Sequence, residues 1–311
     1  MSRLKLSFEI WPNMPYGELP IVGPVTNTWG DKSIAWCIDR IAQYGYEGVD
    51  LFFDKFLFEL EHNDEDSIVR EIREALKNTG IAFHSIGAHY LTITPRWWER
   101  EEGVKMFKKA VDVASKVEAN TICSYIRGGF YDPPTYVIMS YEKAWNILVK
   151  IVKDVAKYAH EKNMNITIEP HAGSILQTVP ESLKLIEDVG YDNVYICADT
   201  GPAFEICVKP FMSIKEAVKM LGDRLNVVHL KDLVGHKGFW KMVWYGGGVV
   251  NFDEWAEALK TINYRYFSTV EWEGWFVGGF TGVGEIGGVG LSDFDRAAKE
   301  ALEFLKKHGF G

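Results

Sequence analysis

The sequence alternates between short runs of β-branched or aromatic residues and longer segments whose apolar residues have helical spacing. Eight β-like runs lie near residues 4–11, 47–53, 81–88, 119–126, 165–169, 193–199, 225–231 and 266–271. Eight consecutive strand–helix units favour a closed barrel, because an open doubly wound sheet seldom contains so many in one chain. The predicted fold class is therefore α/β, a (β/α)8 TIM barrel, with residues 1–311 forming a single domain.

Three of the predicted connections from strand to helix are long, namely residues 12–31, 232–251 and 272–290, which follow strands one, seven and eight. In a TIM barrel such connections surround the active site at the carboxyl ends of the strands. The second and third contain Trp240, Trp244, Trp272 and Trp275. These side chains either pack against a sugar ring or cover the barrel mouth, in which case they also fit a subunit contact.

Charge and cysteine usage exclude several classes of function. The net charge of −9 and the pI near 5.5 argue against a nucleic-acid binder, which needs clustered Lys and Arg. No apolar run approaches the roughly 20 residues of a membrane span, and the first residues lack the apolar core of a secretory signal. The four cysteines form no CxxC pair and are typical of buried thiols in a reducing compartment. We therefore expect a cytoplasmic protein without a nucleic-acid or membrane partner.

Four polar residues stand at the ends of four successive predicted strands: Glu169, Asp199, His229 and Glu271. Singly, each is more often a loop cap, a salt-bridge partner or a satisfied core residue than a ligand. Together they end apolar strands whose carboxyl ends meet on one face, so burying them requires a common positive partner. Carboxylates with one imidazole suit a divalent cation, with Mn²⁺ expected first and Mg²⁺, Co²⁺ or Zn²⁺ as alternatives.

The segments IEPHAGSILQTVPESLKLIEDVG, CADTGPAF, VVHLKD, GGGVVNF and VEWEG carry a resemblance that spans nearly the whole chain. They resemble the sugar phosphate isomerase/epimerase superfamily, whose xylose-isomerase-like barrels include ketose 3-epimerases, inosose dehydratase and 3-oxo-glycoside lyases. The resemblance implies that the four strand-end residues bind one divalent cation. It also implies a sugar or polyol substrate, with Glu169 and Glu271 transferring a proton next to a carbonyl through an enediolate.

His171 opens an alternative reaction. It lies two residues after Glu169, and positions i and i+2 of a strand project to the same side. In some members of the resembling family a histidine at this spacing starts a β-elimination, so a lyase or dehydratase is the main alternative to an isomerase or epimerase. His171 could instead orient a ligand carboxylate. A barrel that binds sugar without catalysis is a third interpretation.

Three further residues are candidates for substrate binding. His89 and Arg127 follow the third and fourth predicted strands, although a strand-end arginine is more often part of a rim ion pair. Lys231 lies two residues after His229 and therefore faces the same pocket. Asp232 is expected to cap the following loop, whereas Glu9 and Asp50 carry no specific signal. Exposed tryptophans at the barrel rim further suggest a homodimer or homotetramer.

Overall fold

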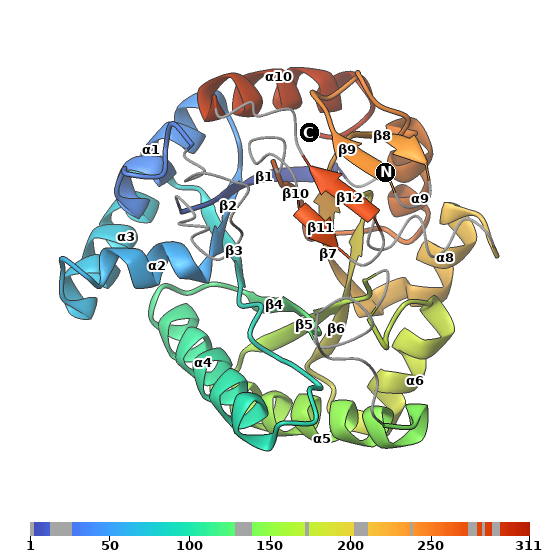
Figure 1. Cartoon of the computed structure of the whole chain (residues 1–311). Coiled ribbons are helices and arrows are strands. Elements are labelled where there is room, and N and C mark those ends of the chain that lie inside the picture. Colours follow the sequence, from blue (N-terminus) through green and yellow to red (C-terminus); the bar gives the residue numbers. More distant parts are fainter. Residues whose placement is uncertain are drawn as a thin grey trace.

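In the computed structural model, eight parallel strands close into a barrel in the order β1-β10-β7-β6-β5-β4-β3-β2, surrounded by helices (Figure 1). The structure describes residues 3–12, 27–127, 139–171, 174–201, 211–236, 239–272, 279–281, 284–287 and 293–311. The barrel strands are β1 (Lys5–Ile10), β2 (Gly48–Phe52), β3 (Ala82–Gly87), β4 (Thr121–Tyr125), β5 (Asn165–Glu169), β6 (Val194–Asp199), β7 (Leu225–Leu230) and β10 (Phe267–Val270). The predicted fold class and all eight predicted strands are confirmed.

The described helices are amphipathic, and their ends carry ordinary stop and start signals. They are α1 (Ile34–Tyr44), α2 (Phe53–Glu59), α3 (Glu65–Thr79), α4 (Trp97–Lys116), α5 (Tyr141–His160), α6 (Val179–Val189), α8 (Ile214–Leu221), α9 (Phe252–Thr261) and α10 (Phe294–Lys307). Thr178 with Glu181 forms a capping box at the start of α6, and Gly190 ends that helix in the left-handed conformation. None of these helices has the length and apolarity that crossing a membrane requires.

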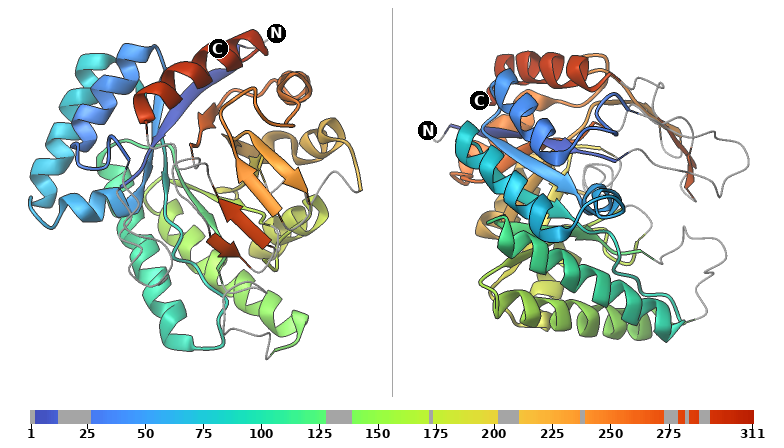
Figure 2. Two further views of the ribbon diagram at one scale, coloured as in Figure 1. Left: turned by 45° about the horizontal axis from the view of Figure 1, so that its top comes forward. Right: turned by 90° about the vertical axis from the view of Figure 1, so that its left-hand side faces the viewer.

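The barrel closes where the two ends of the chain meet. Strand β1 pairs with both β2 and β10, and the backbone N–H of Gly311 donates to the carbonyl of Leu4. Outside these strands, Asp295 of α10 accepts hydrogen bonds from Arg40 and Tyr44 of α1. Both termini therefore lie at the amino end of the barrel, opposite the mouth formed by the carboxyl ends of the strands (Figure 2).

A second, four-stranded sheet lies beside the barrel mouth in the order β11-β12-β9-β8 (Figures 1 and 2). Its strands are β8 (Leu233–His236), β9 (Phe239–Met242), β11 (Gly279–Thr281) and β12 (Gly284–Gly287), so parts of the two long connections after β7 and β10 are strands rather than loops. Of the tryptophans in these connections, Trp272 is 2% exposed and its ring stacks on that of Trp244 at 4.4 Å. The ring of Tyr245 lies beside Trp272, with the ring centroids 6.3 Å apart. The contact of these tryptophans with a sugar ring, with the barrel mouth or with a second subunit stays a prediction. The Trp240 side chain, Trp275 and residues 13–26 of the first long connection lie outside the described residues.

Candidate metal centre and active site

The barrel brings the four strand-end residues together. Glu169 and Asp199 end β5 and β6, His229 precedes the last residue of β7, and Glu271 directly follows β10. These strands are neighbours in the barrel, and Asp199 lies opposite His229 in the register. All four side chains are buried. The four residues therefore lie together, as their positions in the sequence predicted.

Their oxygen and nitrogen atoms approach one another closely, but few of them form hydrogen bonds. Ligand atoms of Glu169, Asp199 and His229 all lie within 4.8 Å of one another. His229 Nδ1 lies 2.7 Å from Glu271 Oε2 and 3.4 Å from Glu169 Oε2. His229 Nδ1, Glu271 Oε2 and Asp199 Oδ2 make ion-pair contacts but accept or donate no regular hydrogen bond. A cation that all four residues coordinate would satisfy these buried atoms.

Lys231 adds a positive charge to the cluster. Its Nζ lies 2.8 Å from Asp199 Oδ2 and 3.1 Å from Glu271 Oε1, and the side chain is 8% exposed. The register explains this contact, since Lys231 follows β7 two residues after His229 and therefore points to the same side. Lys231 thus lies within the ligand cluster, as its spacing predicts.

The electrostatics of the cluster reflect burial working against opposite charges. Burial alone raises the pKa of Glu271, but His229 and Lys231 outweigh it and hold that pKa well below its ordinary value. For Asp199, burial dominates and raises the pKa to about 6 despite the nearby Lys231. Burial would lower the pKa of His229, but Glu271 and Glu169 raise it. The cluster therefore stabilises positive charge, whether it is carried by a proton or by a metal ion.

The remaining predicted substrate-binding residues take different positions at the mouth. His89 follows β3, stacks on Tyr125 at 4.8 Å, and accepts a hydrogen bond at Nδ1 from the backbone N–H of Tyr125. Burial lowers the pKa of His89 to about 4, so its ring is neutral near pH 7. His171 follows β5 with its ring 5.3 Å from that of Tyr125. Arg127 is exposed at the rim, where its backbone pairs with residues 91–93, so its substrate-binding role stays a prediction.

Sequence reasoning gave little weight to a second buried polar group on β1, β2 and β3. Glu9 and Asp50 are paired in the register and are 2% and 1% exposed. Ser85 donates to Asp50 Oδ1, whereas Glu9 Oε2 and Asp50 Oδ2 have no hydrogen-bond partner. His84 is also buried, and neither of its ring nitrogens is hydrogen-bonded. Isolated polar residues in separate strands form no pattern along the sequence, so only the register reveals that they are neighbours.

Asp232 caps the connection after β7, as expected. Its carboxylate accepts backbone N–H groups from Leu233, Gly246, Gly248 and Val250. A Cβ at Gly248 would overlap Asp232 Oδ1, which explains the glycine there. The N–H groups of this glycine run therefore bind an internal carboxylate.

The described cysteines are buried thiols, as the sequence predicted. Cys37, Cys123 and Cys197 are free and buried, and Cys207 lies outside the described residues. Cys123 and Cys197 come close to His229, so this trio also meets a loose distance criterion for metal binding. Burial, however, raises the pKa of the Cys197 thiol well above its ordinary value. A protonated thiol is a poor ligand, which favours the oxygen-rich group beside it.

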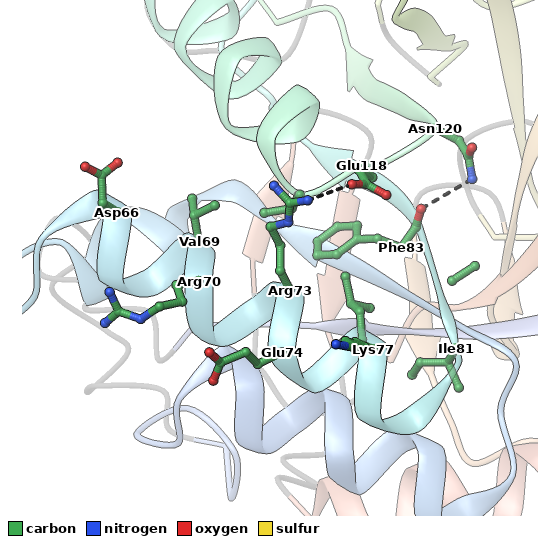
Figure 3. Close-up of a pocket in the computed structure, with 13 residues that line it drawn as sticks. Asp66, Val69, Arg70, Arg73, Glu74, Lys77, Ile81, Phe83, Glu118 and Asn120 are labelled. Carbon is green, nitrogen blue, oxygen red and sulfur yellow. Dashed lines mark hydrogen bonds and ion pairs between the residues drawn. The ribbon is translucent and has the colours of Figure 1, made fainter.

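A hollow of about 750 Å³ lies far from these residues (Figure 3). It is lined by α3, by the beginning of β3 and by the residues that precede β4, so it opens at the amino end of the barrel. Among the charged residues that line it, Arg73 forms an ion pair with Glu118 at 3.0 Å. None of the four strand-end residues lines this hollow, so it is not the candidate active site.

A family model described as a xylose isomerase-like TIM barrel matches residues 38–308. The chain belongs to this family. Inosose dehydratases have similar sequences: that of Clostridium tetani is 27% identical over 213 residues, covering 65% of this chain and 64% of its own length, slightly less than two thirds. Inosose dehydratase 2 of Bacillus cereus is 26% identical over 296 residues, covering 88% of each chain.

Solved structures of this xylose isomerase-like fold include epimerases. D-psicose 3-epimerase from Clostridium cellulolyticum has a TM-score of 0.72 at 18% identity, covering 99% of this chain and 100% of that one. The 3-keto-D-glucoside 4-epimerase YcjR from E. coli has a TM-score of 0.71 at 16% identity, covering 98% and 100%. The IOLI protein, solved with a zinc atom, has a TM-score of 0.66 at 14% identity, covering 98% and 96%. The similar sequences are thus inosose dehydratases, and the solved structures with a similar fold include epimerases.

Proposed function

We propose that this protein is a divalent-metal-dependent isomerase or epimerase that moves a proton next to a carbonyl in a sugar or polyol. The observation that carries the proposal is the convergence of Glu169, Asp199, His229 and Glu271, whose buried ligand atoms crowd together in one space with a lysine beside them. Such an arrangement is costly without a cation. The chemistry that a bound divalent cation would supply is Lewis-acid stabilisation of an enediolate.

Charge balance supports a divalent rather than a monovalent ion. Two glutamates and one aspartate carry three negative charges, and Lys231 supplies one positive charge in contact with two of them. A divalent ion together with Lys231 would neutralise the buried cluster. Mainly oxygen ligands with one imidazole favour Mn²⁺, with Mg²⁺, Co²⁺ and Zn²⁺ as alternatives. The zinc atom in the IOLI structure agrees with a site of this kind.

Glu169 and Glu271 are the groups that we assign to proton transfer. The pKa of each is lowered, because His229 and Lys231 outweigh the effect of burial, so both are ionised at neutral pH and able to accept a proton. They project from β5 and β10, with β6 and β7 between them, and approach His229 from these two strands. A substrate carbon held between them would lose its proton to one carboxylate and regain it from the other.

A second candidate function is β-elimination from a keto-sugar, an inosose or a 3-oxo-glycoside. Its support is the group of inosose dehydratases with similar sequences, together with His171, which lies just beyond Glu169 beside Tyr125. In this reaction the same enolate expels a leaving group, and His171 is the base.

Proton NMR in D₂O distinguishes these functions. We would incubate the Mn²⁺-loaded protein with 3-keto-glucosides, inososes and unmodified ketoses. Exchange of deuterium into recovered sugar or its epimer, without loss of water, is the expected result. An unsaturated or eliminated product would establish the lyase instead, and sugar binding without exchange would leave a binding barrel. Glu271→Gln should lower the exchange rate at least ~100-fold.

The substrate is proposed to lack a phosphate at the loop after β7. The backbone N–H groups of Gly246 and Gly248 in this loop already bind Asp232. A phosphate there would have to displace a buried carboxylate. The cytoplasmic location and the homodimer or homotetramer stay predictions, as does the absence of a nucleic-acid partner.

A further inference from the structure

Two cysteine thiols lie in the barrel interior one layer below the strand-end carboxylates. Cys123 is on β4 and Cys197 is on β6, and both are buried and free of disulfides. Cys197 lies two residues before Asp199. Cys123 is paired in the register with Thr167, which lies two residues before Glu169. Side chains two residues apart on a strand share one side of the sheet, so the thiols face the same interior as the metal-ligand candidates.

The two thiols also approach each other and His229. They hydrogen-bond to one another, and ligand atoms of Cys123, Cys197 and His229 all lie within 4.8 Å of one another. Two sulfurs bound to one zinc-sized ion at about 2.3 Å each lie no more than about 4.6 Å apart. The three side chains are therefore close enough to hold one ion with little movement of the barrel.

The layer that contains the thiols presents sulfur rather than oxygen to an ion. Val227 completes a small buried cluster with the two cysteines. Thr167 is on β5, the strand between them, and its hydroxyl already bonds to Thr121 and Asn226. The hydroxyl of this layer is thus engaged within the protein, so the thiols and the imidazole above them are the donors that an ion would meet.

Sulfur and oxygen ligands select different ions. Carboxylates suit hard ions such as Mn²⁺, whereas thiolates with an imidazole suit softer ions such as Zn²⁺ and Cd²⁺. A thiol releases its proton to the solvent as its sulfur–metal bond forms, so a soft ion uses a thiol that a hard ion leaves protonated. The neutral imidazole of His229 has one nitrogen without a proton and therefore ligates one ion at a time.

We propose that Cys123, Cys197 and His229 form a second, sulfur-rich cation site that takes a soft divalent ion and withdraws His229 from the oxygen cluster. The two sites then exclude each other, because each needs the same imidazole nitrogen. Zinc or cadmium in this site lowers the affinity of the carboxylates for Mn²⁺. The thiol site stands on its own geometry, and only its competition with Mn²⁺ rests on the proposed function.

Titration of the metal-free protein with Cd²⁺ tests the thiol site. Cadmium bound to thiolates gives an ultraviolet charge-transfer absorption that cadmium bound to carboxylates lacks. We expect this band to reach a plateau at about one Cd²⁺ per chain, with a cadmium NMR resonance typical of sulfur ligation. Stoichiometric Cd²⁺ binding without the band, or no Cd²⁺ binding, would overturn the proposal.

Two variants assign the band to its sulfurs. Cys123→Ala and Cys197→Ala should each lower it by about half or more and weaken Cd²⁺ binding at least about tenfold, because one of two sulfur ligands is lost. Cys37→Ala is the matched control, since Cys37 is a buried free thiol on α1, and it should leave the band unchanged. A full band in both folded variants would refute the site. The wild-type NMR resonance decides the ligand type if a variant fails to fold.

Competition with manganese tests the shared histidine. Saturating Mn²⁺ should shift the Cd²⁺ midpoint of the band to a concentration at least about tenfold higher. An unchanged midpoint with Mn²⁺ bound would refute the sharing of His229. Failure to bind Mn²⁺, measured by elemental analysis, would refute the proposed function instead, because the Cd²⁺ band is recorded without manganese.

Discussion

At the scale of single residues, Lys231 adds a buried positive charge to the candidate site. It contacts Asp199 and Glu271 at 2.8 and 3.1 Å in a buried environment. Removing one member of a buried ion group leaves the others uncompensated, which costs far more than losing an exposed pair. A bound cation would replace part of this compensation.

Lys231→Met should therefore lower the free energy of unfolding of the metal-free protein by about 3 kcal/mol, and Mn²⁺ should restore much of that loss. The measurement is chemical denaturation with EDTA and with Mn²⁺. Lys184→Met is the control, because Lys184 pairs with Asp188 on the exposed face of α6. An equal loss with and without Mn²⁺ would show that Lys231 and the metal do not act on the same carboxylates.

The sequence predicted the polar residues that end β5, β6, β7 and β10 better than the polar residues on β1 and β2. Glu169, Asp199, His229 and Glu271 each end an apolar strand, so the sequence marks them as exceptions that need a partner. Glu9 occupies a similar position on β1, but no matching run of acidic strand ends follows on β2 to β4. The closeness of Glu9 to Asp50 depends on the register of the barrel and becomes clear only in three dimensions.

At the scale of secondary-structure elements, the connection between β7 and α9 is organised around one carboxylate. Asp232 accepts N–H groups from four residues on both sides of the β8–β9 hairpin. The sequence indicated a loop cap there, but it did not predict the small sheet. Its short, glycine-rich strands belong to two connections distant in the chain, and strand pairing of this kind has no local signature.

Asp232→Ala should lower the free energy of unfolding by about 3 kcal/mol, because several buried N–H donors lose their acceptor at once. Urea denaturation measures the change. Asp253→Ala is the control: Asp253 is exposed and bonds only to His308 among the described residues, so its loss should be small. A similar effect of both substitutions would contradict the central role of Asp232 in this connection.

At the scale of the whole molecule, contacts between the first and last helices support the closure of the barrel by β1 and β10. Asp295 of α10 lies 2.6 Å from both Arg40 Nε and Tyr44 Oη of α1. Partial burial opposes ionisation, but the hydrogen bonds from Tyr44 and Arg40 prevail and lower the pKa of Asp295. A carboxyl whose pKa is lower in the folded state stabilises the fold above its unfolded pKa, near 3.9, and loses this contribution as the pH falls through the folded value.

Asp295→Asn should therefore destabilise the protein at pH 7, and the difference from wild type should shrink as the pH falls below about 4. Denaturation midpoints across this pH range give the comparison. Asp39→Asn, an exposed substitution on α1, should show no such trend. A difference that grows toward low pH would contradict the assigned interaction.

The overall architecture could be predicted because the spacing of apolar residues and the alternation of strand and helix segments can be followed along the whole chain. Eight alternating units leave few closed arrangements, and the described strands match all eight runs. The reaction is less determined, since proteins named as epimerases and as dehydratases are similar to this chain in fold or in sequence. The choice depends on the placement of a few groups, above all Glu271 and His171.

The central claim is that four strand-end residues hold one divalent ion. Elemental analysis of protein purified without chelators and dialysed against Mn²⁺ tests it most directly. We predict about one metal ion per chain in the wild type and loss of that metal in His229→Ala, with the fold preserved by circular dichroism. Full metal occupancy in the variant, or none in the wild type, would contradict the assignment.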